Sequence, residues 1–127
     1  ISTDAKITFL GHKNALKQYL TIEDNLSLLN LIHHPNLDQF LQKFGLNGCL
    51  DLNLASLSFG QQKKIALLRI FLNDSNLLIM DEPCVGLDNQ TQNYLSNFIN
   101  GELKLGKSVL FSSHIDLDIN SDKLNLS

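Results

Sequence analysis

The sequence has few of the residues that cross-link small domains or create a basic surface. Its 127 residues contain two cysteines, no tryptophan, and ten basic residues against thirteen acidic ones. Cys49 and Cys84 are too few for a disulfide framework and lack metal-ligand spacing, so we expect reduced thiols. A net charge of -3 without a clustered basic face disfavours nucleic acid as a partner.

Long apolar runs and one phosphate-binding sequence are also missing. No stretch is long and apolar enough to span a bilayer, and the first residues lack the charged-then-apolar pattern of a signal peptide. We therefore expect association with a membrane only through a partner protein. No Gly-x-x-x-x-Gly-Lys-Ser/Thr loop occurs, so the sequence offers no P-loop to wrap the phosphates of a nucleotide.

The overall composition is that of one globular domain, or part of one, with 43% hydrophobic and 18% charged residues. Nine of the ten basic residues are lysines, and asparagine, isoleucine and leucine are abundant. This bias is typical of an A/T-rich genome, such as that of an organelle or an endosymbiont.

Apolar periodicity predicts one strand and two helices in the first half of the chain. The run Ile7–Leu10 predicts a buried strand, with a loop over residues 12–20. A helix begins at Thr21 and is stopped by Pro35, and a second helix covers residues 37–44. Two consecutive helices without a strand between them indicate a helical subdomain beside a sheet.

From Ser58 onward the pattern predicts helix, strand, helix and strand. Ser58 and Gln61 form a capping box at the start of a helix that ends near Asn73. The unbroken apolar run over residues 77–80 predicts a strand covered on both faces of a parallel sheet. A helix over residues 89–103 and a strand over residues 108–111 complete a parallel strand-helix-strand unit, and residues 124–126 could form a last strand.

Ser58, Gly60 and Gln61 occupy the start of the third predicted helix, where unpaired N–H groups and the helix dipole favour anions. Gly60 has no side chain that could block a phosphate, and Ser58 adds a hydroxyl donor. The segment is therefore a candidate to grip a terminal phosphate. Alternatively, Ser58 and Gln61 do no more than cap a helix.

Asp81 and Glu82 directly follow the predicted strand at residues 77–80, and ligands of open parallel sheets bind beyond the carboxyl ends of strands. Asp81 is a candidate ligand of Mg²⁺, and Glu82 is a candidate to orient and deprotonate an attacking water. Pro83 keeps Glu82 out of helical geometry and helps to end the strand. An acidic turn is the alternative, but four apolar residues followed by Asp-Glu-Pro are more specific than chance acidity.

Two further polar residues follow these elements along the chain. Asp88 stands where it can cap the helix that begins near Asn89, and capping alone would explain it. His114 lies just past the strand at residues 108–111, at the same expected edge as Asp81 and Glu82. It is a candidate to contact a terminal phosphate, although a lone histidine after a strand is more often an incidental loop residue.

In this order, these pieces resemble the second half of an ATP-binding cassette (ABC) ATPase domain. Leu57-Ser58-Phe59-Gly60-Gln61 is similar to the signature motif, residues 77–82 to the Walker B strand, Gly86-Leu87-Asp88 to the D-loop and His114 to the switch histidine. The resemblance implies an α/β fold, with a partial P-loop NTPase-type parallel sheet, flanking helices and the helical signature subdomain. It divides the chain into a Q-loop region (1–20), the helical signature subdomain (21–75) and a core part with Walker B, D-loop and switch histidine (76–127).

The resemblance also implies cofactors and partners. In the family, two such domains dimerise head to tail, with ATP between the P-loop of one and the signature of the other, and hydrolysis drives a membrane partner. ATP and Mg²⁺ are the implied cofactors. A P-loop-bearing half or second ABC subunit and integral membrane permease subunits are the implied partners. ATPase activity is expected only when such a partner or a missing N-terminal part completes the site.

The front of the chain resembles a narrower group, the haem-exporter ATPases of cytochrome c maturation. Phe9-Leu10-Gly11-His12 is similar to their Q-loop region, and residues 61–67 are similar to their post-signature run. The resemblance implies haem-related export and a peripheral location on the inner membrane, on the bacterial cytoplasmic or the mitochondrial matrix side. In place of the family's Q-loop glutamine stands Lys13, with His12 and Gln18 nearby, and a lysine there could meet a phosphate.

Two other functions stay open from the sequence. A half-cassette that does not hydrolyse ATP could lend its signature helix to a partner or serve as a docking module, although such a module has little use for both Asp81 and Glu82. An ABC ATPase of another transporter, or of a repair or translation system, is the second alternative. The acidic balance and the lack of basic patches disfavour the role outside transport.

Overall fold

The structure, a computed structural model, describes residues 6–11 and 16–112. The chain forms two compact units, which we describe separately: Asn14–Leu72, and Ile1–Lys13 together with Asn73–Ser127. The strand expected at residues 124–126 lies outside the described residues.

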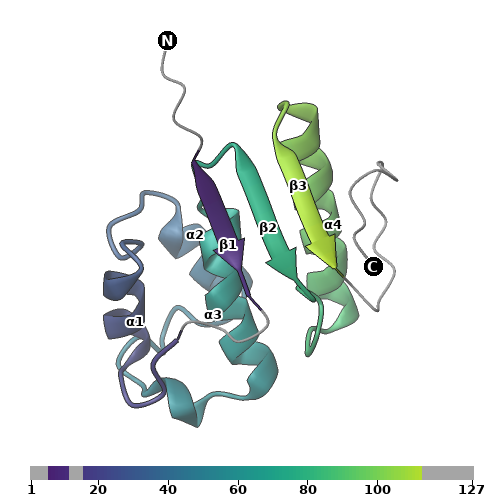
Figure 1. Ribbon diagram of the computed structural model, residues 1–127. Helices are drawn as coiled ribbons and strands as arrows, with labels where there is room; N and C mark the ends of the chain where they lie inside the picture. Colours follow the sequence, from purple (N-terminus) through teal and green to yellow (C-terminus); the bar gives the residue numbers. More distant parts are fainter. Residues whose placement is uncertain (1–5, 12–15, 113–127) are drawn as a thin grey trace. The chain divides into compact units, whose positions relative to one another are not determined.

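The second of these units contains a parallel sheet of three strands. β1 (Ile7–Leu10), β2 (Leu77–Asp81) and β3 (Ser108–Ser112) pair in the order β1-β2-β3, and α4 (Asn89–Lys104) connects β2 to β3 (Figure 1). The predicted α/β fold with a parallel sheet is confirmed. β2 and β3 each extend one residue beyond the predicted strand, to Asp81 and Ser112.

One face of this sheet is buried. Successive residues of a strand point to opposite faces, and residues paired across parallel strands share a face. The face that carries Leu10, Leu78, Met80, Val109 and Phe111 is almost free of solvent contact. α4 packs against β3, and Figure 1 shows it behind that strand.

The opposite face, which we call the open face, is apolar but exposed. Its β1 residues Ile7 and Phe9 are 56% and 53% exposed, and the residues it takes from β2 and β3 are exposed or half-buried. β2 is therefore buried on one face and half-buried on the other, so the prediction of a strand covered on both faces is met in full only on the first. Among the described residues of this unit, no helix lies over the second face (Figure 1). The open face consists of Ile7, Phe9, Leu77, Ile79, Asp81, Ser108, Leu110 and Ser112.

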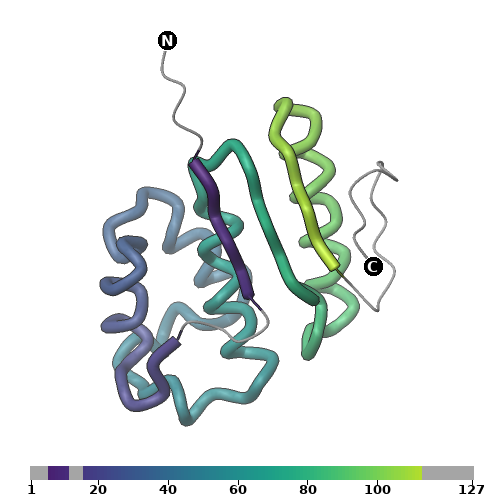
Figure 2. The backbone as a smooth tube through the Cα atoms, in the orientation of Figure 1, coloured from purple at the N-terminus to yellow at the C-terminus, as the bar shows by residue number. Residues whose placement is uncertain are grey.

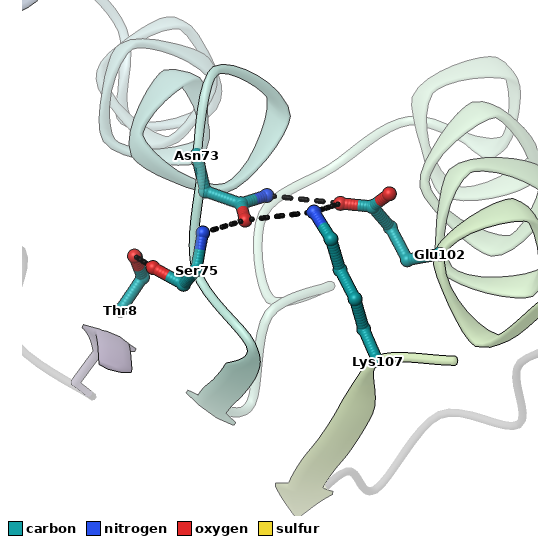
Figure 3. A network of polar contacts seen from close by, with 5 residues as sticks. All are labelled: Thr8, Asn73, Ser75, Glu102 and Lys107. Carbon is teal, nitrogen blue, oxygen red and sulfur yellow. Dashed lines mark hydrogen bonds and ion pairs between the residues drawn. The ribbon is translucent and has the colours of Figure 1, made fainter. Parts of the chain in front are cut away.

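A polar network joins the amino ends of the strands to the last turn of α4 (Figure 3). The buried Glu102 accepts from Lys107 Nζ at 2.9 Å and from Asn73 Nδ2 at 3.1 Å. Asn73 Oδ1 in turn accepts from the backbone N–H of Ser75 at 2.8 Å, and the Ser75 hydroxyl bonds to Thr8 on β1. The network therefore links all three strand starts through hydrogen bonds that satisfy a buried carboxylate.

The other unit is helical and contains α1 (Ile22–Leu28), α2 (Leu37–Lys43), the 3₁₀ turn η1 (Leu54–Ser56) and α3 (Phe59–Phe71). The segment before α1 runs beside the segment that contains η1, as the tube in Figure 2 shows. Backbone hydrogen bonds of 2.9 Å from Ile22 N to Leu52 O and from Leu54 N to Leu20 O hold them together.

The first helix ends earlier than predicted. Thr21 caps α1 as expected, since its hydroxyl accepts from Asp24 N at 3.0 Å. However, α1 stops at Leu28, well before Pro35, because the chain turns at Asn30, which has a left-handed φ of +61°. Asparagine tolerates this conformation better than most residues, so the stop lies in the turn and not in the proline.

α2 and α3 share an aromatic contact in the core of the helical unit. The rings of Phe40 and Phe71 stack with centroids 5.3 Å apart, and Phe44 lies 5.6 Å from Phe71. Both helices match the prediction closely, although α3 ends at Phe71, slightly before the expected Asn73.

The network around Glu102 leads to a first prediction. Lys107→Ala should lower the free energy of unfolding by about 1–3 kcal/mol, because it leaves a buried carboxylate with the weaker hydrogen bond from Asn73. Urea denaturation followed by circular dichroism measures this change. Lys6→Ala is the matched control, because its ion pair with Asp74 is exposed and should contribute little. Equal effects of the two substitutions would contradict a stabilising role for the network.

Candidate functional site

Asp81 and Glu82 lie together at the carboxyl end of β2, as predicted. Asp81 is the last residue of the strand and pairs with Ser112 of β3. The Ser112 hydroxyl donates to Asp81 Oδ1 at 2.6 Å, and the Glu82 N–H donates to the Ser112 carbonyl at 2.8 Å. Both acidic residues are half-buried, so their carboxylates are ordered by the sheet and still reach solvent.

The backbone turns sharply at Glu82. Its φ is +50°, in the left-handed region, which costs a non-glycine residue on the order of 1–3 kcal/mol. Pro83 follows, the strand ends at Asp81 and Glu82 lies outside right-handed helical geometry, as the prediction for this proline requires. A strained residue held between a strand end and a buried proline is typical of a functional turn.

Asp88 begins α4. Gly86 makes the preceding turn possible with a φ of +84°, a conformation that side chains strongly disfavour. The Asp88 carboxylate then accepts from Thr91 N at 2.8 Å and caps the helix. The predicted cap is confirmed, and it ties the segment after Glu82 to a rigid helix end.

The start of α3 is the second group of predicted site residues, and it lies in the helical unit. Gln61 N donates to Ser58 Oγ at 3.1 Å, and Ser58 N donates to Gln61 Oε1 at 2.9 Å, which confirms the predicted capping box. The next amide, that of Gln62, makes the first helical bond, to Ser58 O. The amides of Phe59 and Gly60 have no acceptor within the described part of the chain, so they remain as donors beside the Ser58 hydroxyl.

The structure also shows a side-chain contact that the sequence did not predict. Gln18 and Gln62 exchange side-chain hydrogen bonds of 2.9 and 3.1 Å, and Gln62 Nε2 also donates to the carbonyls of Leu54 and Leu57. Gln62 therefore holds the segment before the capping box in place. A glutamine directly after Gln61 was visible, but its partner forty-four positions away was not.

Several predicted features cannot be placed. Lys13 and His114 lie outside the described residues. Within residues 6–11 and 16–112, no three His, Cys, Asp or Glu side chains gather closely enough to hold a metal ion by themselves. The Asp81 carboxylate and the Ser112 hydroxyl are hard oxygen donors that fit Mg²⁺, which commonly takes one or two carboxylates and completes its shell with phosphates and water.

Within residues 6–11 and 16–112, no helix has the length and apolar character needed to cross a membrane.

Comparison with known sequences identifies the class of protein. Residues 1–85 match the profile of the family described as ABC transporter. The chain belongs to this family, and the resemblance drawn from its motifs is confirmed.

Individual relatives narrow the comparison. The chain is 33% identical over 123 residues to the cytochrome c biogenesis ATP-binding export protein CcmA of Vibrio cholerae serotype O1, covering 93% of this chain and 59% of that protein. It is 36% identical over 112 residues to the protein of the same name from Pseudomonas savastanoi pv. phaseolicola, covering 85% of this chain and 53% of that protein. The chain thus spans between half and three-fifths of the length of these relatives.

A solved structure agrees with the fold. The ATP-binding subunit of an ABC transporter superposes with a TM-score of 0.72 at 27% identity, covering 87% of this chain and 49% of the other. The RNase-L inhibitor superposes with a TM-score of 0.61 at 19% identity, covering 87% of this chain and 22% of the other, and supports the fold alone.

The capping box predicts that substitutions at Ser58 change stability only when they remove the side-chain acceptor. Ser58→Ala should lower the free energy of unfolding by about 1 kcal/mol, because it removes the acceptor for Gln61 N, whereas Ser58→Asp should stay within about 0.5 kcal/mol of wild type. Chemical denaturation followed by the helical circular dichroism signal measures both. A stability for Ser58→Ala that matches wild type would contradict the cap.

Proposed function

We propose that this chain supplies the signature helix and the Walker B carboxylates of an ATPase that drives export in cytochrome c biogenesis. The observation that carries the proposal is the Asp81–Glu82 pair at the carboxyl end of β2. The Ser112 hydroxyl fixes the Asp81 carboxylate through a hydrogen bond of 2.6 Å to Oδ1. A structural acidic turn would not need a strained glutamate next to an aspartate fixed in this way. The family membership and the similarity to CcmA proteins support the same function.

At the start of α3, the capped helix binds the terminal phosphate of ATP. The Ser58 hydroxyl and the amides of Phe59 and Gly60 donate to phosphate oxygens, since the capping box already occupies Gln61 N. Gly60 allows close approach because it has no side chain. Gln61 acts by fixing the helix start, through its side-chain bond to Ser58 N.

At the carboxyl end of β2, the two acidic residues divide the work. Asp81 would hold Mg²⁺, because the hydroxyl of Ser112 keeps its carboxylate in one orientation. The bound Mg²⁺ would neutralise charge on the phosphates. Glu82 orients the attacking water and takes its proton, as a general base placed just outside the strand.

The remaining predicted site residues take supporting roles in this proposal. His114, which follows β3 in the sequence, contacts the terminal phosphate, and Lys13 meets a phosphate in the place of the Q-loop glutamine. Asp88 caps α4 and so fixes the segment that a partner domain meets across the nucleotide.

The site requires partners. The 127 residues contain no P-loop, so in this proposal a P-loop-bearing half, a missing N-terminal part or a second ABC subunit cradles the phosphates of ATP. Hydrolysis drives conformational change in integral membrane permease subunits. The resemblance to cytochrome c maturation ATPases implies that the cargo is related to haem. The complex acts on the inner membrane as a peripheral subunit, on the cytoplasmic side in bacteria such as those of the relatives, or on the matrix side if the composition reflects a mitochondrial genome.

Nucleotide binding should depend on completion of the site. The chain alone should bind ATP with a dissociation constant at least about tenfold weaker than the chain mixed with a P-loop-bearing partner. Isothermal titration with ATP and Mg²⁺ measures both, with the part of the Vibrio cholerae relative outside the match as the partner. Equal affinity in the two samples would contradict a shared site.

Glu82→Gln should trap ATP in the completed complex. Loss of the general base should lower kcat by about 100-fold or more and leave ATP binding intact, because glutamine keeps the shape but cannot take a proton. Phosphate release assays and retention of labelled ATP measure the two effects. Glu23→Gln is the matched control, since Glu23 is an exposed glutamate on α1. A wild-type complex that binds ATP but releases no phosphate would favour the non-hydrolysing half-cassette.

A further inference from the structure

A pair of glutamine side chains joins two segments of the helical unit that lie far apart in the sequence. Gln18 Nε2 donates to Gln62 Oε1 at 2.9 Å, and Gln62 Nε2 donates to Gln18 Oε1 at 3.1 Å. Both residues belong to the unit Asn14–Leu72. A reciprocal pair of this kind uses one donor and one acceptor of each amide. Each amide therefore fixes the orientation of the other.

The Gln62 amide also holds the turn that leads into α3. Gln62 Nε2 donates to the carbonyls of Leu54 at 3.0 Å and Leu57 at 3.3 Å, in addition to Gln18. If the amide were turned over, its oxygen would face these three oxygen acceptors, so the amide has one favourable orientation. Leu57 directly precedes Ser58, the capping residue of α3. The orientation of Gln62 thus determines where the start of α3 lies.

The backbone that carries Gln18 is itself held in place. The buried Asn25 side chain accepts from Lys17 N at 2.7 Å and donates to Lys17 O at 3.1 Å, so it binds both polar backbone groups of one residue. Ala55 N donates to Gln18 O at 3.1 Å. A side chain on a fixed backbone loses less conformational entropy when it forms a hydrogen bond. Gln18 is therefore a fixed anchor for Gln62, although its side chain is exposed.

The helix start that this arrangement holds is the one that carries the proposed phosphate donors. Within the described part of the chain, the amides of Phe59 and Gly60 have no acceptor, and the Ser58 hydroxyl lies beside them. Donors bind an anion more tightly when they are oriented before it arrives, because binding then requires less ordering. The bonds from Gln62 to the preceding turn provide this orientation.

We infer that Gln18 is a positioning residue for the signature helix: through Gln62, it holds the turn before Ser58 and so orients the amides of Phe59 and Gly60 toward a phosphate. The inference rests on the proposed function, because it takes the start of α3 as the place where the terminal phosphate of ATP binds. It adds a residue forty-four positions before Gln62, outside the signature motif, on which the phosphate affinity of that motif depends.

Nuclear magnetic resonance of the full chain tests the positioning without ATP. Gln18→Ala should shift the amide resonances of Phe59 and Gly60, because Gln62 loses the partner that orients it. In a chain that already carries Gln62→Ala, the same substitution should cause no further shift, since Gln18 acts only through Gln62. Gln42→Ala is the matched control, because Gln42 is an exposed glutamine on α2 of the same unit, and both resonances should stay in place.

ATP turnover is the second readout, in the chain completed by the part of the Vibrio cholerae relative outside the match. Gln18→Ala should raise KM for ATP about three- to tenfold and leave kcat within about twofold of wild type, because Asp81 and Glu82 are unchanged. A residue that only stabilised the fold would lower Tm and leave KM as it is. If Gln62→Ala does not fold, the comparison of Gln18→Ala with Gln42→Ala still decides the question.

Three outcomes would overturn the inference. They are unshifted resonances of Phe59 and Gly60 in Gln18→Ala, an additional shift of the same size in the Gln62→Ala chain, and a lower Tm with a wild-type KM. Shifted resonances in a chain whose completed complex hydrolyses no ATP would reject the proposed function and keep the positioning of the helix start. ATP hydrolysis with unshifted resonances would do the reverse.

Discussion

The parallel register of β2 and β3 is the constraint on which the proposed catalytic site depends. It pairs Asp81 with Ser112, brings the serine hydroxyl to 2.6 Å from the carboxylate, and lets the Glu82 N–H bond to the Ser112 carbonyl. The residue before Asp81 is the buried Met80. A slip of one residue in the pairing would turn every side chain to the other face, so it would bury the aspartate and expose the methionine. The apolar core thus fixes the position of the carboxylates, because burying Met80 requires Asp81 to face the other way.

The same alternation puts Asp81 on the less buried face of the sheet. That face also carries Ile7 and Phe9, which are mostly exposed in this chain. Exposed apolar strands at the edge of a sheet promote aggregation unless another segment covers them. Ile79 and Asp81 are two residues apart on β2, so any segment that covers the apolar part of this face also lies near the proposed metal ligand.

Short-range signals in the sequence predict most of the helices and strands, whereas the sequence does not predict contacts between distant residues. The capping box at Ser58 and the cap at Asp88 involve residues three positions apart, and the strands follow from short, mostly apolar runs. The sequence does not predict the early end of α1, because Asn30 adopts a left-handed φ without the usual glycine. It also does not predict that one face of β2 is only half-buried, because an apolar run indicates that a strand needs cover but not which segment provides it. The bonds from Ser112 to Asp81 and from Gln18 to Gln62 join residues thirty-one and forty-four positions apart, and nothing local predicts them.

Capping and phosphate binding at α3 were alternatives in the sequence, yet the geometry makes them compatible. The cap occupies Gln61 N and the oxygen of Ser58 as acceptor, while the Ser58 O–H and the amides of Phe59 and Gly60 remain available as donors. A fixed helix start therefore needs little further ordering when an anion binds. The start of α3 is therefore ready to bind an anion, but the acidic end of β2 is not. The adjacent carboxylates of Asp81 and Glu82 repel a triphosphate until positive charge is supplied. Mg²⁺ and the lysine of a P-loop are the groups that supply it in nucleotide-binding sites of this kind. In the proposed function, the electrostatics of the two acidic residues therefore make nucleotide binding depend on positive charge that the described residues do not supply at this site.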